Sequence, residues 1–375
     1  MAKRVLIFHT SGGRGHISAA KAIEQALAAK YPQVEVKNVN IIDYAPVAYR
    51  KVFDDGYSYI TNNHPKLWGW FFDKMDRELN RKLPILLSKL AIEKKFNRLI
   101  LDYRPDFIIA THPLPIWLIN AAKDQKLPPI KSSIVVTDFN CHRVWVDQTV
   151  DYYFVASQKV FETLKNYGVA ANRIVTTGIP IELKFTATAS PDILIKQLNL
   201  EVGVPTFLIV GGMLNFSSVK KVVQGMREKN QNIQFVIIAG RDKKLKKDLL
   251  ESSLSRDPRV KVFGFIDNIQ DFMATADLAF SKAGGLTVAE CMSQGLPMVF
   301  NQVIPGQEEG NVSYLVEAGA ASKANDLEGV IVAASEILSD QKKLAAMKEA
   351  CRKIGKPQAA LTLADFVQSI IGRQT

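Results

Sequence analysis

Short apolar runs alternate with helical patterns twice along the chain. The runs are rich in Val, Ile and Phe, and each is followed by a stretch with apolar residues at helical spacing. This order is typical of α/β domains in which helices cover a parallel sheet, so the sequence predicts two such domains. The first set of predicted strands is Val5–His9, Val34–Val39, Phe107–Thr111, Ile134–Thr137 and Tyr152–Ala156. The second set is Phe207–Val210, Phe235–Ala239, Val260–Phe263, Leu278–Ser281 and Met298–Phe300.

Between the two sets, residues 180–191 contain turn-forming and small residues without a strong period. The segment predicts a boundary between an N-terminal domain over residues 1–183 and a C-terminal domain over residues 192–355. The stretch Pro357–Ile371 has a helical pattern, so residues 356–375 could form a helix that crosses back to the N-terminal domain. At 375 residues the chain is long enough for two domains of this kind.

The first predicted strand leads through small residues into a helix predicted over Ile17–Leu27. The loop between them holds Ser11, Gly12, Gly13 and Gly15. Glycines let backbone N–H groups approach a ligand closely, and a helix N-terminus favours anionic or oxygen-rich ligands. The spacing fits neither G-x-x-x-x-G-K-[ST] nor G-x-G-x-x-G, because Ser18 stands where the second pattern needs a third glycine. The loop alone therefore leaves its ligand open.

The second half has two similar turns. "FLIVGGMLNF" is a strand, a Gly-Gly turn and a helix that begins near Ser217. "DLAFSKAGGLTVAE" is a strand, the turn 283–285, and a helix with Thr287 in its first turn and Glu290 one turn later. Donors and a hydroxyl at a helix N-terminus suit a diphosphate, and a deeper carboxylate can accept two ribose hydroxyls. The alternative is a tight turn followed by a solvated glutamate.

A third motif, "PGQEEGN", follows the last predicted strand. It places four polar side chains at the start of the next helix, those of Gln307, Glu308, Glu309 and Asn311. Amides and carboxylates gathered at one helix entry can form paired hydrogen bonds with sugar hydroxyls. Helix capping would explain one of the four, but hardly all of them.

The cysteines and the apolar runs limit the class of protein. Cys141, Cys291 and Cys351 are far apart and form no C-x-x-C, which argues against a disulfide framework or a zinc site. No signal sequence is evident, and no apolar run approaches the roughly 20 residues that a membrane-spanning helix needs. We therefore expect a cytoplasmic protein.

The net charge of +11 is concentrated in the first half. Residues 1–180 hold 25 Lys and Arg against 16 Asp and Glu, a net charge of +9. Such a balance favours an anionic partner, either nucleic acid or a membrane surface. Nucleic acid is not expected, because no motif that reads nucleic acid is present.

Residues 64–98 favour the membrane. They mix basic residues with a cluster of aromatics that includes Trp68, Trp70 and Phe71. Aromatic side chains with basic neighbours suit an element that lies among anionic lipid headgroups, so we expect a peripheral protein at the inner face of the cell membrane. The alternative is that these residues cover the core of their own domain.

Six motifs in matching order resemble one known family. They are "SGGRGHISAA", "THPLP", "VTDFNCH" with the later Trp145, "TGIP", "SKAGGLTVAE" and "PGQEEGN". The chain resembles the monogalactosyldiacylglycerol synthases and the bacterial processive diacylglycerol glucosyltransferases, which belong to glycosyltransferase family 28. The resemblance extends from the first strand to about Ala321, and the last two motifs are its most specific part.

The resemblance implies a GT-B fold, an α/β architecture of two Rossmann-like domains that face each other across a cleft. It also implies transfer of glucose or galactose from a UDP-sugar to the hydroxyl of diacylglycerol. Residue by residue, Gly212, Gly284, Gly285 and Thr287 would lie at the diphosphate, and Glu290 at the ribose. The backbone near Phe265 would meet the uracil, and Gln307 and Glu308 would hold the sugar. Gly12, Gly13, Gly15 and His16 would line the acceptor side.

An attacking hydroxyl needs a base, and the unperturbed pKa of histidine suits that role near neutral pH. His16 is the first candidate, so the rate should fall on the acid side within the range where histidine titrates. Asp138, directly after a predicted strand, could orient this base or act as the base itself. His112 and His142 are weaker candidates, because a histidine beside a proline, as at position 112, is more often a hydrogen-bonded loop residue.

We expect no cofactor. The UDP-sugar is a substrate, and helix N-termini can stabilise the leaving UDP without a metal. No D-x-D motif of metal-dependent glycosyltransferases occurs. Three alternatives remain open: transfer to a different lipid, a UDP-sugar epimerase of the same fold, and a binding protein that has lost turnover.

Overall fold

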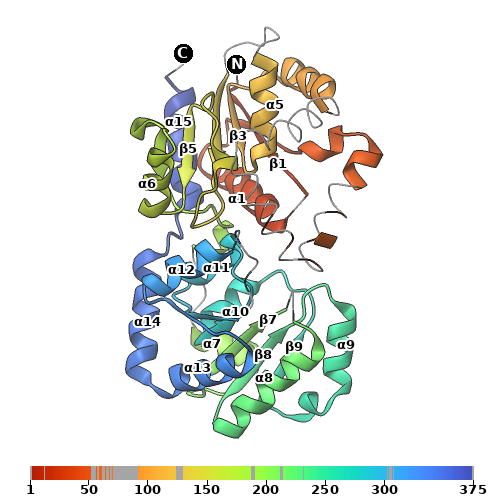
Figure 1. Cartoon of the computed structure of the whole chain (residues 1–375), viewed down its shortest axis with the longest axis vertical. Helices are drawn as coiled ribbons and strands as arrows, with labels where there is room; N and C mark the ends of the chain where they lie inside the picture. Colours follow the sequence, from red (N-terminus) through yellow and green to blue (C-terminus); the bar gives the residue numbers. More distant parts are fainter. Residues whose placement is uncertain are drawn as a thin grey trace. The chain divides into compact units, whose positions relative to one another are not determined.

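A computed structural model gives the structure of the chain (Figure 1). It describes residues 2–11, 13–51, 56, 59–60, 64, 67, 70, 92–123, 130–186, 191–211, 214–230, 232–301, 303, 306 and 308–373. The chain divides into two compact units. The first comprises Met1–Leu183, Ile304–Gly310 and Lys356–Thr375, and the second comprises Lys184–Val303 and Asn311–Gly355.

The first unit contains a parallel six-stranded sheet in the order β2-β1-β3-β4-β5-β6. Its strands are β1 (Arg4–His9), β2 (Glu35–Asn40), β3 (Phe107–Ala110), β4 (Lys131–Val135), β5 (Tyr152–Val155) and β6 (Ile174–Thr176). Its helices are α1 (Arg14–Lys30), α5 (Pro113–Lys123), α6 (Gln158–Asn166) and α15 (Ala359–Ile371), and residues 92–103 are also helical.

Helix α15 packs into the core of the first unit. Its apolar face includes Leu363 and Val367, which lie in one buried cluster with residues of α1 and β1. The Phe366 ring meets the Tyr152 and Phe154 rings of β5, with centroids 5.0 and 5.4 Å apart. In Figure 1 the helix accordingly lies beside β5. The end of the chain thus completes the hydrophobic core of the unit that holds its beginning.

The second unit contains a parallel six-stranded sheet in the order β12-β11-β10-β7-β8-β9. Its strands are β7 (Thr206–Val210), β8 (Gln234–Ile238), β9 (Val260–Phe263), β10 (Leu278–Phe280), β11 (Met298–Phe300) and β12 (Ala321–Lys323). Its helices are α7 (Pro191–Gln197), α8 (Phe216–Lys229), α9 (Lys243–Glu251), α10 (Ile269–Thr275), α11 (Gly285–Ser293), α13 (Leu327–Ser339) and α14 (Gln341–Ile354). Helix α12 (Glu309–Glu317) begins at the unit boundary.

The prediction of two parallel, helix-covered sheets is confirmed, with three differences in detail. The edge strands β6 and β12 were not predicted, because only the first of their three residues is buried and they carry no continuous apolar run. Strand β4 begins at Lys131 rather than Ile134, since its Ser132 and Ser133 are buried in the sheet despite being polar. Helix α1 begins at Arg14, so Gly15 and His16 lie in its first turn and not in the preceding loop.

The strand orders locate the ligand-binding edge of each sheet. In parallel α/β sheets, ligands bind outside the carboxyl ends of the strands, at the point where the strand order reverses. That point lies between β1 and β3 in the first unit and between β7 and β10 in the second. The loops after these four strands are therefore the expected binding loops. They contain three of the six motifs, "SGGRGHISAA" after β1, "THPLP" after β3 and "SKAGGLTVAE" after β10.

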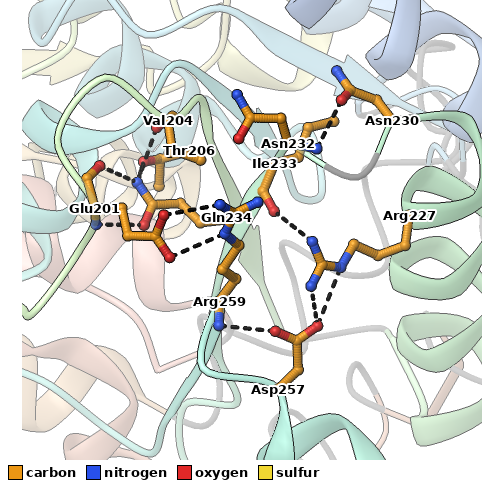
Figure 2. Close-up of polar contacts among 10 residues, drawn as sticks. All are labelled: Glu201, Val204, Thr206, Arg227, Asn230, Asn232, Ile233, Gln234, Asp257 and Arg259. Carbon is orange, nitrogen blue, oxygen red and sulfur yellow. Dashed lines mark hydrogen bonds and ion pairs between the residues drawn. The ribbon is translucent and has the colours of Figure 1, made fainter.

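Polar contacts link the chain at the amino ends of the strands in the second sheet, opposite the expected binding loops (Figure 2). The buried Gln234 amide donates to the carbonyls of Glu201 and Val204 at 3.0 and 2.9 Å, and to the Thr206 hydroxyl at 3.0 Å. Arg259 forms a bidentate ion pair with Glu201, both bonds measuring 3.0 Å. These contacts join the segments that precede β7, β8 and β9, so they stabilise the end of the sheet away from the expected binding loops.

Candidate active site

The His16 side chain lies at the point of strand reversal in the first sheet. Its Nδ1 atom is 2.6 Å from the carbonyl oxygen of Thr111, which follows β3. The Thr137 hydroxyl, just after β4, is 3.3 Å from the same nitrogen. The Thr111 hydroxyl donates to the His16 carbonyl at 2.9 Å, so both the ring and the backbone of His16 are fixed by one residue.

These contacts determine the tautomer of His16. A carbonyl oxygen can only accept a hydrogen bond, so Nδ1 carries the proton and donates it to Thr111. The lone pair of the neutral ring is then on Nε2. A Cβ atom built on Gly13 would lie 3.9 Å from Nε2, so the basic nitrogen lies beside the glycine turn. Gly13 has φ = 121°, a conformation that residues with a side chain rarely adopt.

Burial lowers the pKa of His16 to about 4. The hydrogen bond to Thr111 acts in the opposite direction, and a charge on His9 would lower the value further. Low-dielectric surroundings disfavour the imidazolium form, which is why burial has the largest effect. The lowered pKa moves the expected acid limb of the rate below the range in which histidine ordinarily titrates.

The pH dependence of the reaction follows from this shift. The neutral ring is the active base, and it persists down to a pH near its lowered pKa. We expect kcat/KM to be flat from about pH 6 to 8 and to fall only toward pH 4, measured with buffers that keep the enzyme folded. An acid limb centred between pH 6 and 7 would contradict a His16 ring that its surroundings keep neutral.

A second histidine lies at the end of β1, where the sequence suggested no role. The His9 Nδ1 atom is 2.9 Å from the Asn38 Oδ1 atom, and the Asn38 amide donates to Glu24 at 3.0 Å. Because the carboxylate of Glu24 can only accept, the oxygen of Asn38 faces His9, which therefore carries its proton on Nδ1. Burial lowers the pKa of His9 as well.

Two aromatic rings surround His16. The His112 ring meets it edge to face with centroids 4.9 Å apart, and the Trp145 ring lies 6.1 Å away. The His112 Nδ1 atom accepts a hydrogen bond from the Leu114 amide at 3.1 Å, and His142 does the same for Val144. Both rings thus accept a hydrogen bond from the backbone two residues later, as expected for His112. Asp138 is half-buried and directly follows Thr137, and its role stays a prediction.

The predicted diphosphate turn lies at the point of strand reversal in the second sheet. Helix α11 begins after Gly284, and this N-cap residue makes no side-chain hydrogen bond to the first turn. Thr287 and Glu290 are half-buried on this helix. The N-terminal amides of an uncapped helix favour an anion. Lys282 adds a cation that the sequence reading missed, with its Cε atom 3.6 Å from a Cβ built on Gly284.

The turn after β7 approaches the next strand closely. A Cβ atom built on Gly211 would lie 3.0 Å from the Ile238 carbonyl oxygen, so a side chain at this position would be crowded. Phe265 follows β9 with 54% of its surface exposed, and the Arg241 guanidinium lies 4.8 Å from its ring centroid. An exposed aromatic ring beside a cation offers a surface for a planar base.

Two polar residues of "PGQEEGN" have local structural roles. The Asn311 amide donates to the Ala283 carbonyl at 2.8 Å, which ties α12 to the diphosphate turn. Glu309 accepts a hydrogen bond from the Gly306 amide at 3.2 Å. Glu308 is only 3% exposed. The predicted site residues Gly12, Gly212 and Gln307 lie outside the described residues, as do Trp68 and Phe71.

Within the described residues, no three His, Cys, Asp or Glu side chains gather as metal ligands would. The expectation of metal-free chemistry rests on the motifs and stays a prediction. Likewise, no helix among the described residues is long and apolar enough to cross a membrane.

Comparison with known proteins places the chain in a family. The profile of monogalactosyldiacylglycerol (MGDG) synthase matches residues 16–181, and that of the glycosyltransferase family 28 C-terminal domain matches residues 206–363. A processive diacylglycerol beta-glucosyltransferase of Bacillus cereus is 30% identical over 368 residues, which are 97% of this chain and 93% of the relative. This chain therefore belongs to the glycosyltransferase family that includes the MGDG synthases and the processive diacylglycerol glucosyltransferases. A Bacillus thuringiensis relative of the same name is equally similar, with the same coverage.

Solved structures of this family's wider fold class agree with the architecture. MnaA of S. aureus with UDP has a TM-score of 0.65 at 13% identity, covering 99% of this chain and 97% of that one. MurG of Acinetobacter baumannii has a TM-score of 0.63 at 17% identity, covering 98% and 99%. A UDP-GlcNAc 2-epimerase of Neisseria meningitidis has a TM-score of 0.62 at 13% identity, covering 98% and 100%. The chain thus has the GT-B fold predicted from its motifs.

Proposed function

We propose that this protein is an inverting glycosyltransferase that moves a hexose from a UDP-sugar to the hydroxyl of diacylglycerol at a membrane surface. The product is a β-glycosyl diacylglycerol. The 30% identity to diacylglycerol beta-glucosyltransferases along almost the whole chain supports the substrates, and the names of both Bacillus relatives favour glucose. The observation that carries the chemistry is His16, held by Thr111 as a neutral ring with its lone pair on Nε2.

The reaction is a single displacement. Nε2 of His16 takes the proton of the diacylglycerol hydroxyl as that oxygen attacks the anomeric carbon. The bond from the anomeric carbon to the β-phosphate oxygen breaks, and UDP leaves with the electron pair. Attack opposite the leaving group inverts an α-linked UDP-sugar to a β-linked glycolipid. General-base help of this kind supplies about 10²–10⁴-fold in rate.

The second unit would hold the donor. The N-terminus of α11 and the turn at Gly284 and Gly285 suit the diphosphate, and Lys282 adds positive charge beside it. Fixed amides and a helix dipole stabilise the charge that develops on the leaving UDP, so no metal is required in this proposal. Glu290 would accept the ribose hydroxyls, and the surface at Phe265 would take the uracil.

The membrane part of the proposal rests on charge and exposure. Leu67 and Trp70 are 55% and 59% exposed, more than core residues would be. The first half of the chain is also strongly basic. These features suit a peripheral protein on an anionic lipid surface at the inner face of the membrane.

Vesicle binding tests this part. Binding should rise with the phosphatidylglycerol content of the vesicles and fall with added salt, because headgroup attraction is screened within about 10 Å at 0.1 M salt. Serine in place of Trp68, Trp70 and Phe71 should abolish the binding that remains at high salt. Equal binding to neutral and anionic vesicles, measured by sedimentation, would rule out the electrostatic contribution.

One experiment separates the proposed function from its alternatives. The purified protein is given labelled UDP-glucose or UDP-galactose with diacylglycerol micelles, and UDP-N-acetylglucosamine alone in a third reaction. We expect label in the lipid extract only when diacylglycerol is present. Epimerisation of UDP-N-acetylglucosamine without lipid would instead support the epimerase alternative, and binding without any product would support a binding protein.

A further inference from the structure

An exposed aromatic ring lies at the expected ligand-binding edge of the second sheet. Phe265 comes two residues after β9, and 54% of its surface is exposed. The phenylalanines within the sheet, such as Phe207 and Phe235, are buried. A single exposed apolar side chain is common on protein surfaces. Phe265 differs because it lies in the loop where the proposed function places the uracil, so the orientation of its ring matters for binding.

The Arg241 side chain covers one face of this ring. Its guanidinium carbon lies over the ring, 4.8 Å from the centroid, which is within the range of a cation–π contact. Ile238 and Phe263 pair at the carboxyl ends of β8 and β9, so the two loops leave the sheet side by side. Arg241 and Phe265 follow these paired residues by three and two positions. The guanidinium is thus placed to orient the ring.

The backbone at Arg241 is fixed on both sides. Gly240 has φ = 62°, and the Asp242 amide donates to the Ala239 carbonyl at 3.3 Å, so the chain turns sharply between β8 and α9. The Asp242 carboxylate then caps α9 by accepting a hydrogen bond from the Leu245 amide at 2.8 Å. This turn holds the start of the Arg241 side chain in one place.

Other contacts hold the backbone of the loop after β9. The Lys184 ammonium donates to the Asp267 carbonyl at 2.8 Å. The Lys246 side chain lies against Gly264, where a built Cβ atom would be 3.1 Å from the Cδ atom of the lysine. Neither contact involves the guanidinium of Arg241. Loss of that guanidinium should therefore release the aromatic ring without moving the loop that carries it.

We infer that Arg241 is a positioning residue for the nucleobase: it holds one face of the Phe265 ring, so that the other face receives the uracil of the donor. The inference rests on the proposed function for the identity of the base. The faces of an aromatic ring carry negative charge, and a cation on one face reduces the charge on the other. The open face then suits a base that carries carbonyl oxygens. A ring that is already held also loses less conformational freedom when a base stacks on it.

Arg241→Ala and Phe265→Leu test the inference by calorimetry with UDP alone. Loss of an exposed cation–π contact should weaken UDP binding about threefold to fivefold in Arg241→Ala. Loss of the ring removes the stacking surface itself, so Phe265→Leu should weaken UDP binding by about tenfold or more. In Arg241→Ala, kcat at saturating UDP-glucose should stay within about twofold of wild type, because the base is bound equally before and during the reaction.

The double variant shows whether Arg241 acts through the ring. Without the ring the guanidinium has nothing to hold, so Arg241→Ala/Phe265→Leu should bind UDP within about 1.5-fold of Phe265→Leu alone. An equal loss from Arg241→Ala in both backgrounds would mean that Arg241 contacts UDP directly, and would overturn the inference. An Arg241→Ala protein with wild-type UDP affinity would overturn it as well.

Lys247→Ala is the matched control for charge. Lys247 lies on α9, and its ammonium is 3.9 Å from the Glu251 carboxylate instead of over a ring. The variant removes one positive charge, as Arg241→Ala does, yet it should change UDP affinity by less than about 1.5-fold, because exposed charges are screened by salt. A loss equal to that of Arg241→Ala would show an effect of net charge and would overturn the positioning role.

Binding of UDP alone keeps this inference separate from the proposed function. If the wild-type protein binds UDP but forms no glycolipid, the proposed acceptor is wrong, and the double-variant comparison still tests Arg241. If glycolipid forms but the two substitutions act independently on UDP affinity, only the positioning role of Arg241 is lost. A wild-type protein that binds no UDP would refute the proposed donor and this inference together.

Discussion

Replacement of His16 with alanine or asparagine should slow diacylglycerol glycosylation by about 10²-fold or more, with little change in fold or UDP affinity. The lower end of the range for general-base catalysis is expected, because a ring with a pKa of about 4 is a weak base. The His16 ring is nevertheless neutral at pH 7, so its Nε2 atom can accept a proton. The rate is measured with saturating UDP-glucose and diacylglycerol.

The asparagine variant separates catalysis from positioning. Its amide can still donate to the Thr111 carbonyl, so the local structure is kept while the basic nitrogen is lost. A structural role for His16 would be worth on the order of 1 kcal/mol, as for a helix cap, and asparagine would largely restore it. If the asparagine variant keeps most of its activity, Asp138 is the better candidate for the base. If the variant unfolds, His16 has a structural role.

Replacement of Glu290 with alanine should weaken UDP binding by about tenfold or more. A carboxylate that accepts two ribose hydroxyls forms charge-assisted hydrogen bonds, and a hydrogen bond to a charged group contributes about 1.5–3 kcal/mol net, so the loss of even one gives about tenfold. Calorimetry with UDP alone measures the effect without any acceptor. An unchanged affinity for UDP would show that Glu290 does not bind the ribose.

Gln234→Ala is the control for this variant. Gln234 lies in the second unit, but its hydrogen bonds are at the amino ends of the strands, away from the predicted UDP site (Figure 2). Its loss leaves two part-buried carbonyls and a buried hydroxyl without this partner, which should cost about 1–3 kcal/mol of unfolding free energy. UDP affinity at a temperature below the transition should not change. A decrease like that of Glu290→Ala would mean that the binding assay reports stability.

Periodic features of the chain were predictable from sequence. Buried parallel strands are continuous apolar runs, so ten of the twelve strands that the structure describes were found, and with them the two sheets. The sequence also placed Thr287 and Glu290 on one helix, as in the structure. What failed was local: Gly15 has a low helix propensity, so the start of α1 was placed after it, although the structure begins the helix at Arg14.

The contacts that define the base were not predictable. The partner of His16 is a backbone carbonyl, that of Thr111, and any residue type supplies such a group. Its lowered pKa arises from burial, which depends on rings at positions 112 and 145 far along the chain. Similarly, Asn311 looked like a sugar ligand but bonds Ala283, because side-chain amides serve backbone and sugar equally well.

The configuration of the glycosidic bond tests the central claim, direct displacement of UDP by the diacylglycerol hydroxyl, most directly. The lipid product from UDP-glucose is purified, and the coupling constant of its anomeric proton is measured by NMR. A single displacement assisted by His16 predicts a β-glycosidic bond from the first turnover onward. An α-glycosidic product would contradict the account, because it requires either two displacements or a mechanism that retains configuration.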